Sequence, residues 1–156
     1  MQVIQQLKQM SEDRFLHIYD TLSKDGFGPL DGEVAAALKF RPHTIKRLPM
    51  AKRAGRARLI LQSDSNAELA YELFGAYLMS NCKDIITAFL DATDVTHEEG
   101  MIDDPASDRP DPAKVAAAVA SLDESHPPED VTLYLSMCAE QWPDIEEVNT
   151  VWQMRS

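Results

Sequence analysis

The sequence predicts an all-α fold, a compact irregular bundle of about eight or nine short helices that forms a single domain over residues 1–156. Apolar side chains recur at three- and four-residue spacing along almost the whole chain, which is the period of a helix with one buried face. No run of strict alternation indicates a strand, and no segment repeats at the fixed period of a helical solenoid. With 44% hydrophobic residues, a chain of 156 residues can bury a core without disulfide bonds.

In the first third of the chain, turn residues and prolines divide the helical pattern into short pieces. Ser11 can cap a helix that ends before the turn at residues 25–29, and a second helix begins at Asp31. A third, over residues 42–48, lies between two prolines, of which the first suits a helix start and the second ends it. A fourth helix is expected over residues 50–62.

The middle of the chain combines a strongly apolar helix with an acidic segment. Residues 65–68 form a capping box for a helix that continues to Ser80 and that we expect to be central in the core. A very short connection leads to a helix over residues 85–90, which favours antiparallel packing of the two. Residues 95–111 contain six acids, two prolines and few apolar side chains, and we interpret them as a long acidic loop within the domain.

Prolines also mark the starts of the last three helices. Asp111 and Pro112 supply an N-cap and a first-turn proline, and residues 126–128 separate this helix from the next one. Pro143 is expected to start the last helix. Trp142 and Trp152 lie near its two ends and are expected to complete the core, because burial of an indole removes a large apolar area from water.

Charge is unevenly distributed along the chain. The net charge of −11 disfavours non-specific nucleic-acid binding by the whole molecule, because the summed field repels phosphate. Eight of the fifteen Lys and Arg residues lie between Lys39 and Arg58, and no acid occurs over residues 34–63. Residues 81–156 hold seventeen acids and four bases. The basic stretch is therefore the first place to look for a partner site.

One segment of the basic stretch combines two short helices with a turn. Small and apolar side chains fill residues 34–38, and after the turn Ile45 and Leu48 share one face of a short helix whose basic side chains point away from it. Residues 33–58 thereby resemble the helix-turn-helix of bacterial repressors, which implies DNA binding. The candidate partner-binding or nucleic-acid-binding residues are Lys39, Arg41, His43, Lys46, Arg47, Lys52, Arg53 and Arg56, the last three on an outer arc of the fourth helix. Alternatively, these bases form a solvated face, or they pair with acids of the same chain or of a second copy.

An imidazole and several carboxylates occur close together in the acidic loop. His97, Glu98, Asp103 and Asp104 are suitable ligand types for a divalent cation, although their spacing matches no metal motif. The alternative is one capped turn of helix with solvated acids. The sequence predicts no metal and no cofactor, and a metal-dependent protein centred on residues 97–104 remains an alternative function.

Catalytic and targeting signals are lacking in the sequence. It contains no nucleophile elbow and no Gly-rich phosphate loop, and Cys82 and Cys138 are spaced neither for zinc nor for redox chemistry. Both cysteines are expected on buried helix faces. No secretory leader and no membrane-spanning stretch is recognised, which predicts a cytoplasmic protein without membrane insertion. The sequence favours a non-enzymatic interaction domain that binds a protein partner or itself, with nucleic acid as the alternative partner.

Overall fold

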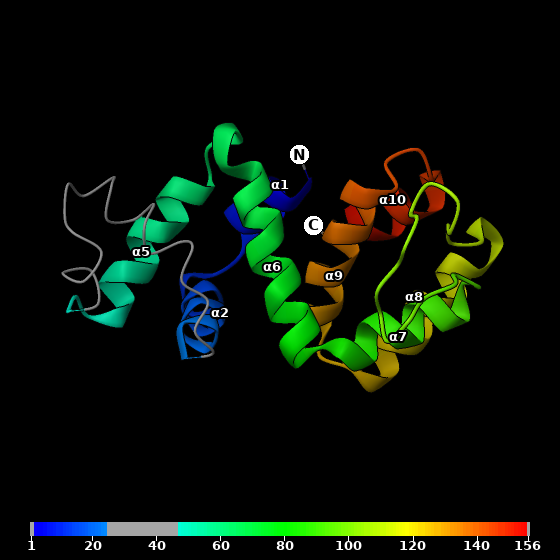
Figure 1. Cartoon of the computed structure of the whole chain (residues 1–156), viewed down its shortest axis with the longest axis horizontal. Coiled ribbons are helices and arrows are strands. Elements are labelled where there is room, and N and C mark those ends of the chain that lie inside the picture. The colour runs from blue at the N-terminus through cyan, green and yellow to red at the C-terminus, as the bar shows by residue number, and fades with distance from the viewer. Residues whose placement is uncertain (1, 25–46, 156) are drawn as a thin grey trace. The chain divides into compact units, whose positions relative to one another are not determined.

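The computed structural model describes residues 2–24 and 47–155, and over these residues it confirms the predicted all-α class (Figure 1). This part of the chain contains eight α-helices, one short 3-10 helix and a single isolated β-bridge. The elements are α1 (Gln2–Gln9), α2 (Glu12–Lys24), α5 (Met50–Leu61), η1 (Asp64–Asn66), α6 (Ala67–Asn81), α7 (Lys83–Ala92), α8 (Pro112–Ser125), α9 (Pro128–Gln141) and α10 (Glu146–Gln153). The helices predicted from Asp31 and over residues 42–48 lie outside the described residues, apart from the last two positions of the second.

The contacts divide the chain into two compact units, with the boundary inside α6. The N-terminal unit comprises Val3–Leu73 and the C-terminal unit Phe74–Ser156. This boundary also divides the charge, because residues 1–73 hold eleven bases and nine acids, whereas residues 74–156 hold four bases and seventeen acids. The single domain over residues 1–156 stays a prediction.

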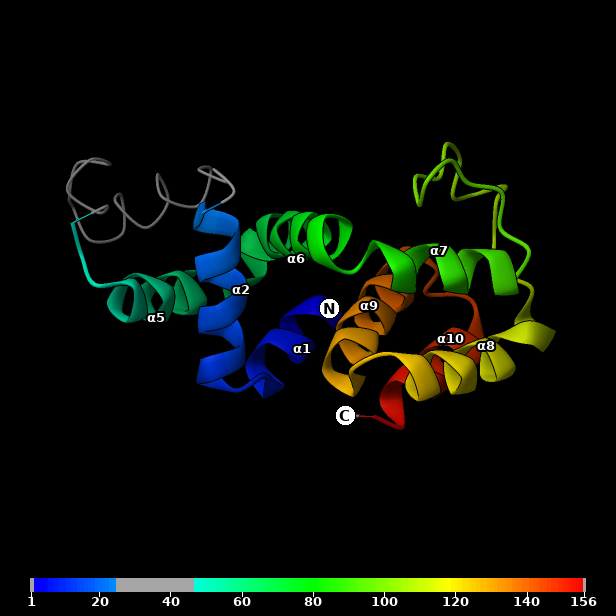
Figure 2. The same cartoon turned by 90° about the horizontal axis from the view of Figure 1, so that it is seen from below.

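In the N-terminal unit, α2 packs against α5, as both views of the ribbon show (Figures 1 and 2). The apolar stripe predicted for α2 is buried, and small side chains of α5 face it, so the two backbones can approach closely. Ser11 caps α2 as predicted, since its Oγ accepts the N–H of Arg14 at 3.1 Å. The buried side chains are Phe15, Ile18, Tyr19 and Leu22 of α2 and Ala54, Ala57 and Leu61 of α5.

The short helix α1 was not predicted. Its side chains Val3, Ile4 and Leu7 are fully or almost fully buried. Arg58 of α5 donates hydrogen bonds from Nη2 to the carbonyl of Leu7, at 3.0 Å, and to that of Met10. These carbonyls lie at the end of α1, where no backbone N–H of the helix can reach them, and a cation is favoured there by the helix dipole.

In the C-terminal unit, α9 is the central helix. Eight of its fourteen residues are buried, and it contacts α7, α8 and α10. The ring of Tyr134 on α9 meets that of Phe89 on α7 edge to face, with centroids 5.4 Å apart. Trp142 and Trp152 are each 1% exposed, which confirms that both belong to the core.

The predicted antiparallel packing of α6 and α7 is wrong. Cys82 alone separates the two helices, and one residue is too short to reverse the chain, which takes about two to five residues. Both views show α7 continuing away from the end of α6, and α7 packs instead against α8 and α9 (Figures 1 and 2). Among the described residues, no helix is both long enough and apolar enough to cross a bilayer.

Local hydrogen bonds decide where three of the helices begin. Asp111 accepts the N–H of Ala113 at 3.1 Å with Pro112 in the first helical turn of α8, as predicted. The segment predicted as a capping box, residues 65–68, instead contains the end of η1 and the start of α6, and the Ser65 hydroxyl lies 2.8 Å from that of Ser63. The last helix starts at Glu146 rather than at Pro143, since Ile145 N–H first closes a turn onto the Trp142 carbonyl.

The end of α10 is held by one arginine that bridges two other helices. Arg155 donates from Nη1 and Nη2 to the two carboxylate oxygens of Asp123 on α8, at 2.7 and 2.8 Å. Its Nε donates to Oγ1 of Thr132 on α9 at 2.8 Å. The side chain is 16% exposed, so this bidentate pair is better shielded from water than an ordinary surface ion pair.

We expect Arg155→Ala and Arg155→Lys to destabilise the protein by about 1–3 kcal/mol, because neither side chain can make the bidentate contact to Asp123 and the bond to Thr132 together. The free energy of unfolding in urea measures the loss. The control is Lys24→Ala, which removes an exposed pair with Asp20 and should cost less than about 0.5 kcal/mol. Equal losses for Lys24 and Arg155 would contradict the bridging role of Arg155.

Candidate interaction surface

Four of the eight candidate partner-binding residues lie in the described part of the chain. These four are Arg47, Lys52, Arg53 and Arg56. The other four, Lys39, Arg41, His43 and Lys46, lie outside the described residues. The observable part of the candidate surface is therefore α5 and the turn that precedes it.

Arg53 does not share the outer arc of α5 with the other bases, which corrects the prediction. Its side chain is 8% exposed, and its guanidinium carbon lies 5.8 Å from the ring centroid of Tyr19, in the range of a cation–π contact. The sequence held a signal for this position, since Arg53, Ala57 and Leu61 are spaced four apart and share the buried side of the helix. An arginine can occupy such a side because its stem is apolar.

Arg47, Lys52 and Arg56 are exposed, and we call these three residues the basic face. Lys52 and Arg56 lie four residues apart on one side of α5, and Arg47 lies in the turn before the helix. None of the three forms an ion pair with a described residue of the N-terminal unit. In the C-terminal unit each of the four bases has a carboxylate partner, in the pairs Lys83–Glu99, Arg109–Asp144, Lys114–Asp94 and Arg155–Asp123.

A groove runs between α2 and α5 in the N-terminal unit. Its volume is about 720 Å³, and Glu12 and Asp13, both exposed, form its acidic rim on α2. At its edge Leu59 is 62% exposed. Apolar and small residues form most of its lining: Met10, Phe15, Leu16, Ala51, Ala54 and Gly55. We call this feature the α2/α5 groove.

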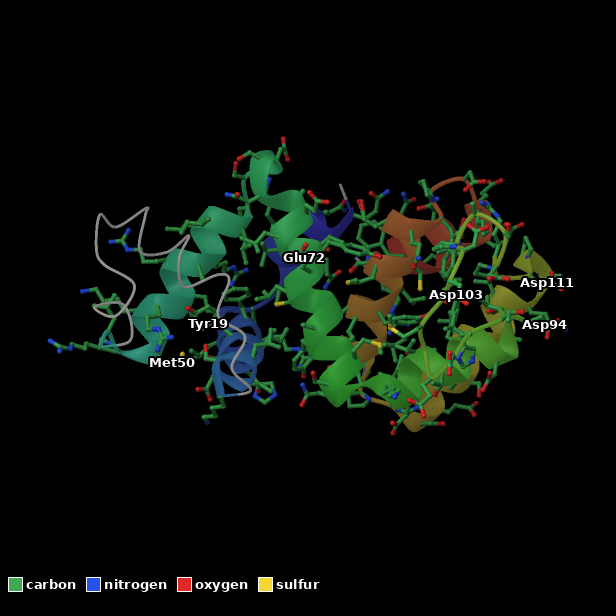
Figure 3. All side chains as sticks on the ribbon, viewed as in Figure 1. Tyr19, Met50, Glu72, Asp94, Asp103 and Asp111 are labelled. Carbon is green, nitrogen blue, oxygen red and sulfur yellow. The ribbon has the colours of Figure 1, made fainter. Side chains whose placement is uncertain are left out.

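The α2/α5 groove continues into a shallower depression of about 440 Å³ at the start of α5. Asp13, Leu16 and Ala51 line both features, and Asp20 and Met50 line the second only. Figure 3 shows Met50 at the start of α5 and Tyr19 on α2, the two helices that form the walls. Sequence reasoning missed the groove because it depends on how two helices pack, which no local pattern specifies.

Both ring nitrogens of His97 are engaged by neighbouring groups in the acidic loop. Nδ1 accepts the N–H of Gly100 at 3.0 Å, so the proton of the neutral ring is on Nε2, which donates to Oδ1 of Asp91 at 2.6 Å. The other candidate ligands do not converge on it, and no group of three His, Cys, Asp or Glu side chains suited to a metal is found in the described ranges. His97 therefore braces the loop.

A tight turn, rather than a turn of helix, follows His97. Glu98 and Met101 exchange two backbone hydrogen bonds of 2.9 Å each, and the residues between them, Glu99 and Gly100, have φ angles of 50° and 90°. Positive φ at both central positions is the signature of a type I′ turn. A Cβ on Gly100 would lie 3.2 Å from Cγ2 of Ile86, so the turn also lies close against α7.

Several contacts tie the rest of the acidic loop to helices of its own unit. Nε1 of the buried Trp142 donates to the carbonyl of Pro105 at 3.0 Å. Arg109 pairs with Asp144, and its hydrogen bond holds the pKa of that carboxyl below the ordinary value. Asp94, Asp103 and Asp111 lie along the connection between α7 and α8 in Figure 3. The hydrogen bond to Asp94 raises the pKa of Lys114.

Both cysteines are buried, as predicted, and neither is placed to act as a nucleophile. Burial raises the pKa of the Cys138 thiol from 9.0 to about 12, because the thiolate would have to form in the apolar interior around α9. At neutral pH this thiol is protonated and shielded.

We expect the stability of the protein to fall at alkaline pH through Cys138. Its raised folded-state pKa contributes fully below pH 9.0, and this contribution is lost as pH rises toward about 12, because the unfolded chain ionises first. The free energy of unfolding, measured at about pH 8 and about pH 10.5, should therefore decrease more in the native sequence than in Cys138→Ala. Equal decreases in the two proteins would contradict the buried, protonated thiol.

We expect Gly100→Ala to destabilise the protein by about 1–2 kcal/mol, because alanine is strained at the positive φ of this turn and its Cβ would crowd Ile86. Urea denaturation gives the measurement. Gly75→Ala is the matched control: it lies within α6, a Cβ there would be at an ordinary 3.5 Å from Met137, and alanine should stabilise the helix by up to about 1 kcal/mol. A neutral Gly100→Ala would contradict the strained turn.

No family model matches this chain, and no curated protein and no solved structure is similar enough to match it. Its function is therefore inferred from its own residues and their geometry.

Proposed function

We propose that this chain is a non-catalytic interaction domain that binds an acidic surface of a protein partner through the basic face on α5. One observation carries the proposal. Arg47, Lys52 and Arg56 are exposed without an ion-pair partner in the described N-terminal unit, although the chain has a large excess of acids. In the same unit the folded chain uses Arg53 and Arg58 for internal contacts.

The basic face suits a partner contact on electrostatic grounds. Exposed cations steer an acidic partner toward the correct orientation. Their attraction to its carboxylates becomes stronger once the partner excludes water from the contact. Lys52 and Arg56 lie on a formed helix, so little backbone entropy would be lost when a partner binds. The apolar α2/α5 groove beside them supplies the area that charges alone do not.

Two other functions have weaker support. DNA binding would use the same exposed cations, but the net charge of −11 opposes it, and most of the helix-turn-helix segment that resembles repressors lies outside the described residues. A metal-dependent function centred on residues 97–104 would require His97 to give up its contact with Asp91 or with Gly100, and no group of three suitable ligands surrounds it among the described residues. The basic face is therefore the better-supported site.

We expect the double variant Lys52→Glu with Arg56→Glu to lose its partner, with binding weakened at least tenfold by repulsion from the acidic surface. Affinity capture with quantitative mass spectrometry compares the amount of each co-purified protein between native and variant bait. The matched control is Lys8→Glu, another exposed cation of the same unit, on α1. Circular dichroism checks that all three proteins are folded.

The outcomes separate the classes of partner. Proteins lost with the double variant and kept with Lys8→Glu support the proposal. An identical set of proteins for all three baits overturns it. Binding of a labelled DNA duplex at about 50 mM salt that the double variant loses would instead show a nucleic-acid partner.

A further inference from the structure

We propose that the acidic partner of the basic face is a second copy of this chain, and that the two copies dock through their α2/α5 grooves. This inference rests on the proposed function and names its partner. The surface carries both signs of charge: Glu12 and Asp13 on the α2 side and Lys52 and Arg56 on α5. None of these four side chains has an ion-pair partner among the described residues of the N-terminal unit.

Such a surface is complementary to itself. In a two-fold interface every contact is made twice, so α2 of each copy can face α5 of the other. Glu12 and Asp13 of one copy then meet Lys52 and Arg56 of its partner, and the same pairs form again across the axis. The dimer would pair four acids with four bases in this way, and each copy alone leaves its two acids and two bases exposed to water.

The apolar side chains of α5 supply the second component of the interface. Ala51, Gly55 and Leu59 are spaced four residues apart along one exposed stripe of α5, next to Lys52 and Arg56. Leu59 is the only large apolar side chain that the described N-terminal unit leaves strongly exposed, at 62%. A second copy whose α5 enters the groove would cover this side chain on both copies, in the manner of an amphipathic helix bound in a groove.

Gly55 gives an independent reason to expect a close neighbour. It lies inside a helix, where glycine is less stable than alanine, and a Cβ built on it would meet no atom within 4 Å. Nothing in the described part of the chain therefore requires a glycine here. In a two-copy interface the missing side chain would let the helix backbone of the partner approach α5 directly.

The signs of the charges favour a second copy over a different partner. A purely acidic protein surface, or the phosphates of a nucleic acid, would meet Glu12 and Asp13 with like charge at the rim of the groove. A second copy presents bases opposite these acids and acids opposite the bases. A second copy therefore matches the acids on the rim of the groove and also the bases of α5, which lie next to the groove and not in its lining.

The test is the molar mass of the full chain in solution, measured by analytical ultracentrifugation from about 1 to about 300 μM, the range in which an interface of modest size dissociates. We expect a reversible dimer. The double variants Lys52→Glu with Arg56→Glu and Glu12→Lys with Asp13→Lys should each be monomeric. Mixed in equal amounts, they should form a heterodimer, because the reversed charges are complementary again.

Two further variants test the apolar contact and the glycine. Leu59→Asp should weaken the dimer at least tenfold, whereas Met154→Asp, at a side chain that is 81% exposed in the C-terminal unit, should leave it unchanged. Gly55→Ala should raise the urea midpoint of the monomer and yet weaken the dimer at least tenfold. Opposite effects on stability and on association are not expected from a merely structural glycine.

Each outcome decides the inference. A chain that is monomeric throughout overturns it. A dimer that persists in all of these variants also overturns it, because another surface would hold the copies together. If the chain is monomeric while Lys52→Glu with Arg56→Glu still loses captured proteins, the proposed function stands and only the second copy is wrong. If the chain is monomeric and captures the same proteins in every variant, both proposals are wrong.

Discussion

The packing of α2 against α5 determines which cations of the basic stretch remain available on the surface. Successive helix residues are 100° apart, so a helix with bases at four of seven consecutive positions cannot keep all of them in water while it buries one side. Arg53 therefore lies over Tyr19, and Arg58 reaches the carbonyls at the end of α1. Lys52 and Arg56 are left exposed. The same packing forms the α2/α5 groove, so internal stability and the candidate interaction surface have one cause.

The C-terminal unit, in contrast, has a large excess of acids over bases. Each of its four bases contacts a carboxylate. Two of these ion pairs stabilise segments that bury few apolar side chains: Arg109 pairs from the acidic loop, and Arg155 pairs from the end of the chain. The remaining acids are mostly exposed to water, where repulsion between like charges is weak. The loop has its own braces in His97 and Trp142. These contacts hold the loop against helices of its own unit.

The sequence predicted the elements that have a clear apolar period and missed those decided by other forces. Helices α2, α5, α8 and α9 follow from spacing and caps. Helix α1 carries its apolar residues at the i, i+1 and i+4 positions but is only eight residues long, and its end is stabilised by Arg58 from a distant part of the chain. The start of α10 was placed too early because a turn onto Trp142 forms first.

The candidate surface was only partly predictable for a related reason. Charge counting located the basic stretch, but it treats every arginine as exposed, whereas the position of Arg53 on the helix places it on the buried side. The α2/α5 groove and the acids on its rim belong to a segment some forty residues earlier in the sequence than α5. No local pattern connects the two, because their proximity is a result of tertiary packing.

Net charge and local charge have different ranges, and this difference reconciles an acidic chain with a docking surface of mixed sign. Two copies that each carry −11 repel one another at long distance, but at physiological salt the field of an exposed charge decays over about 8 Å. Most of the negative charge belongs to residues 74–156, whereas residues 1–73 have two more bases than acids. At contact distance the nearest charges dominate. Once water is excluded from the α2/α5 groove, these charges would be screened less than they are in bulk solvent. The segregation of acids into the second half of the chain would thus allow the first half to form the attractive contacts proposed for it.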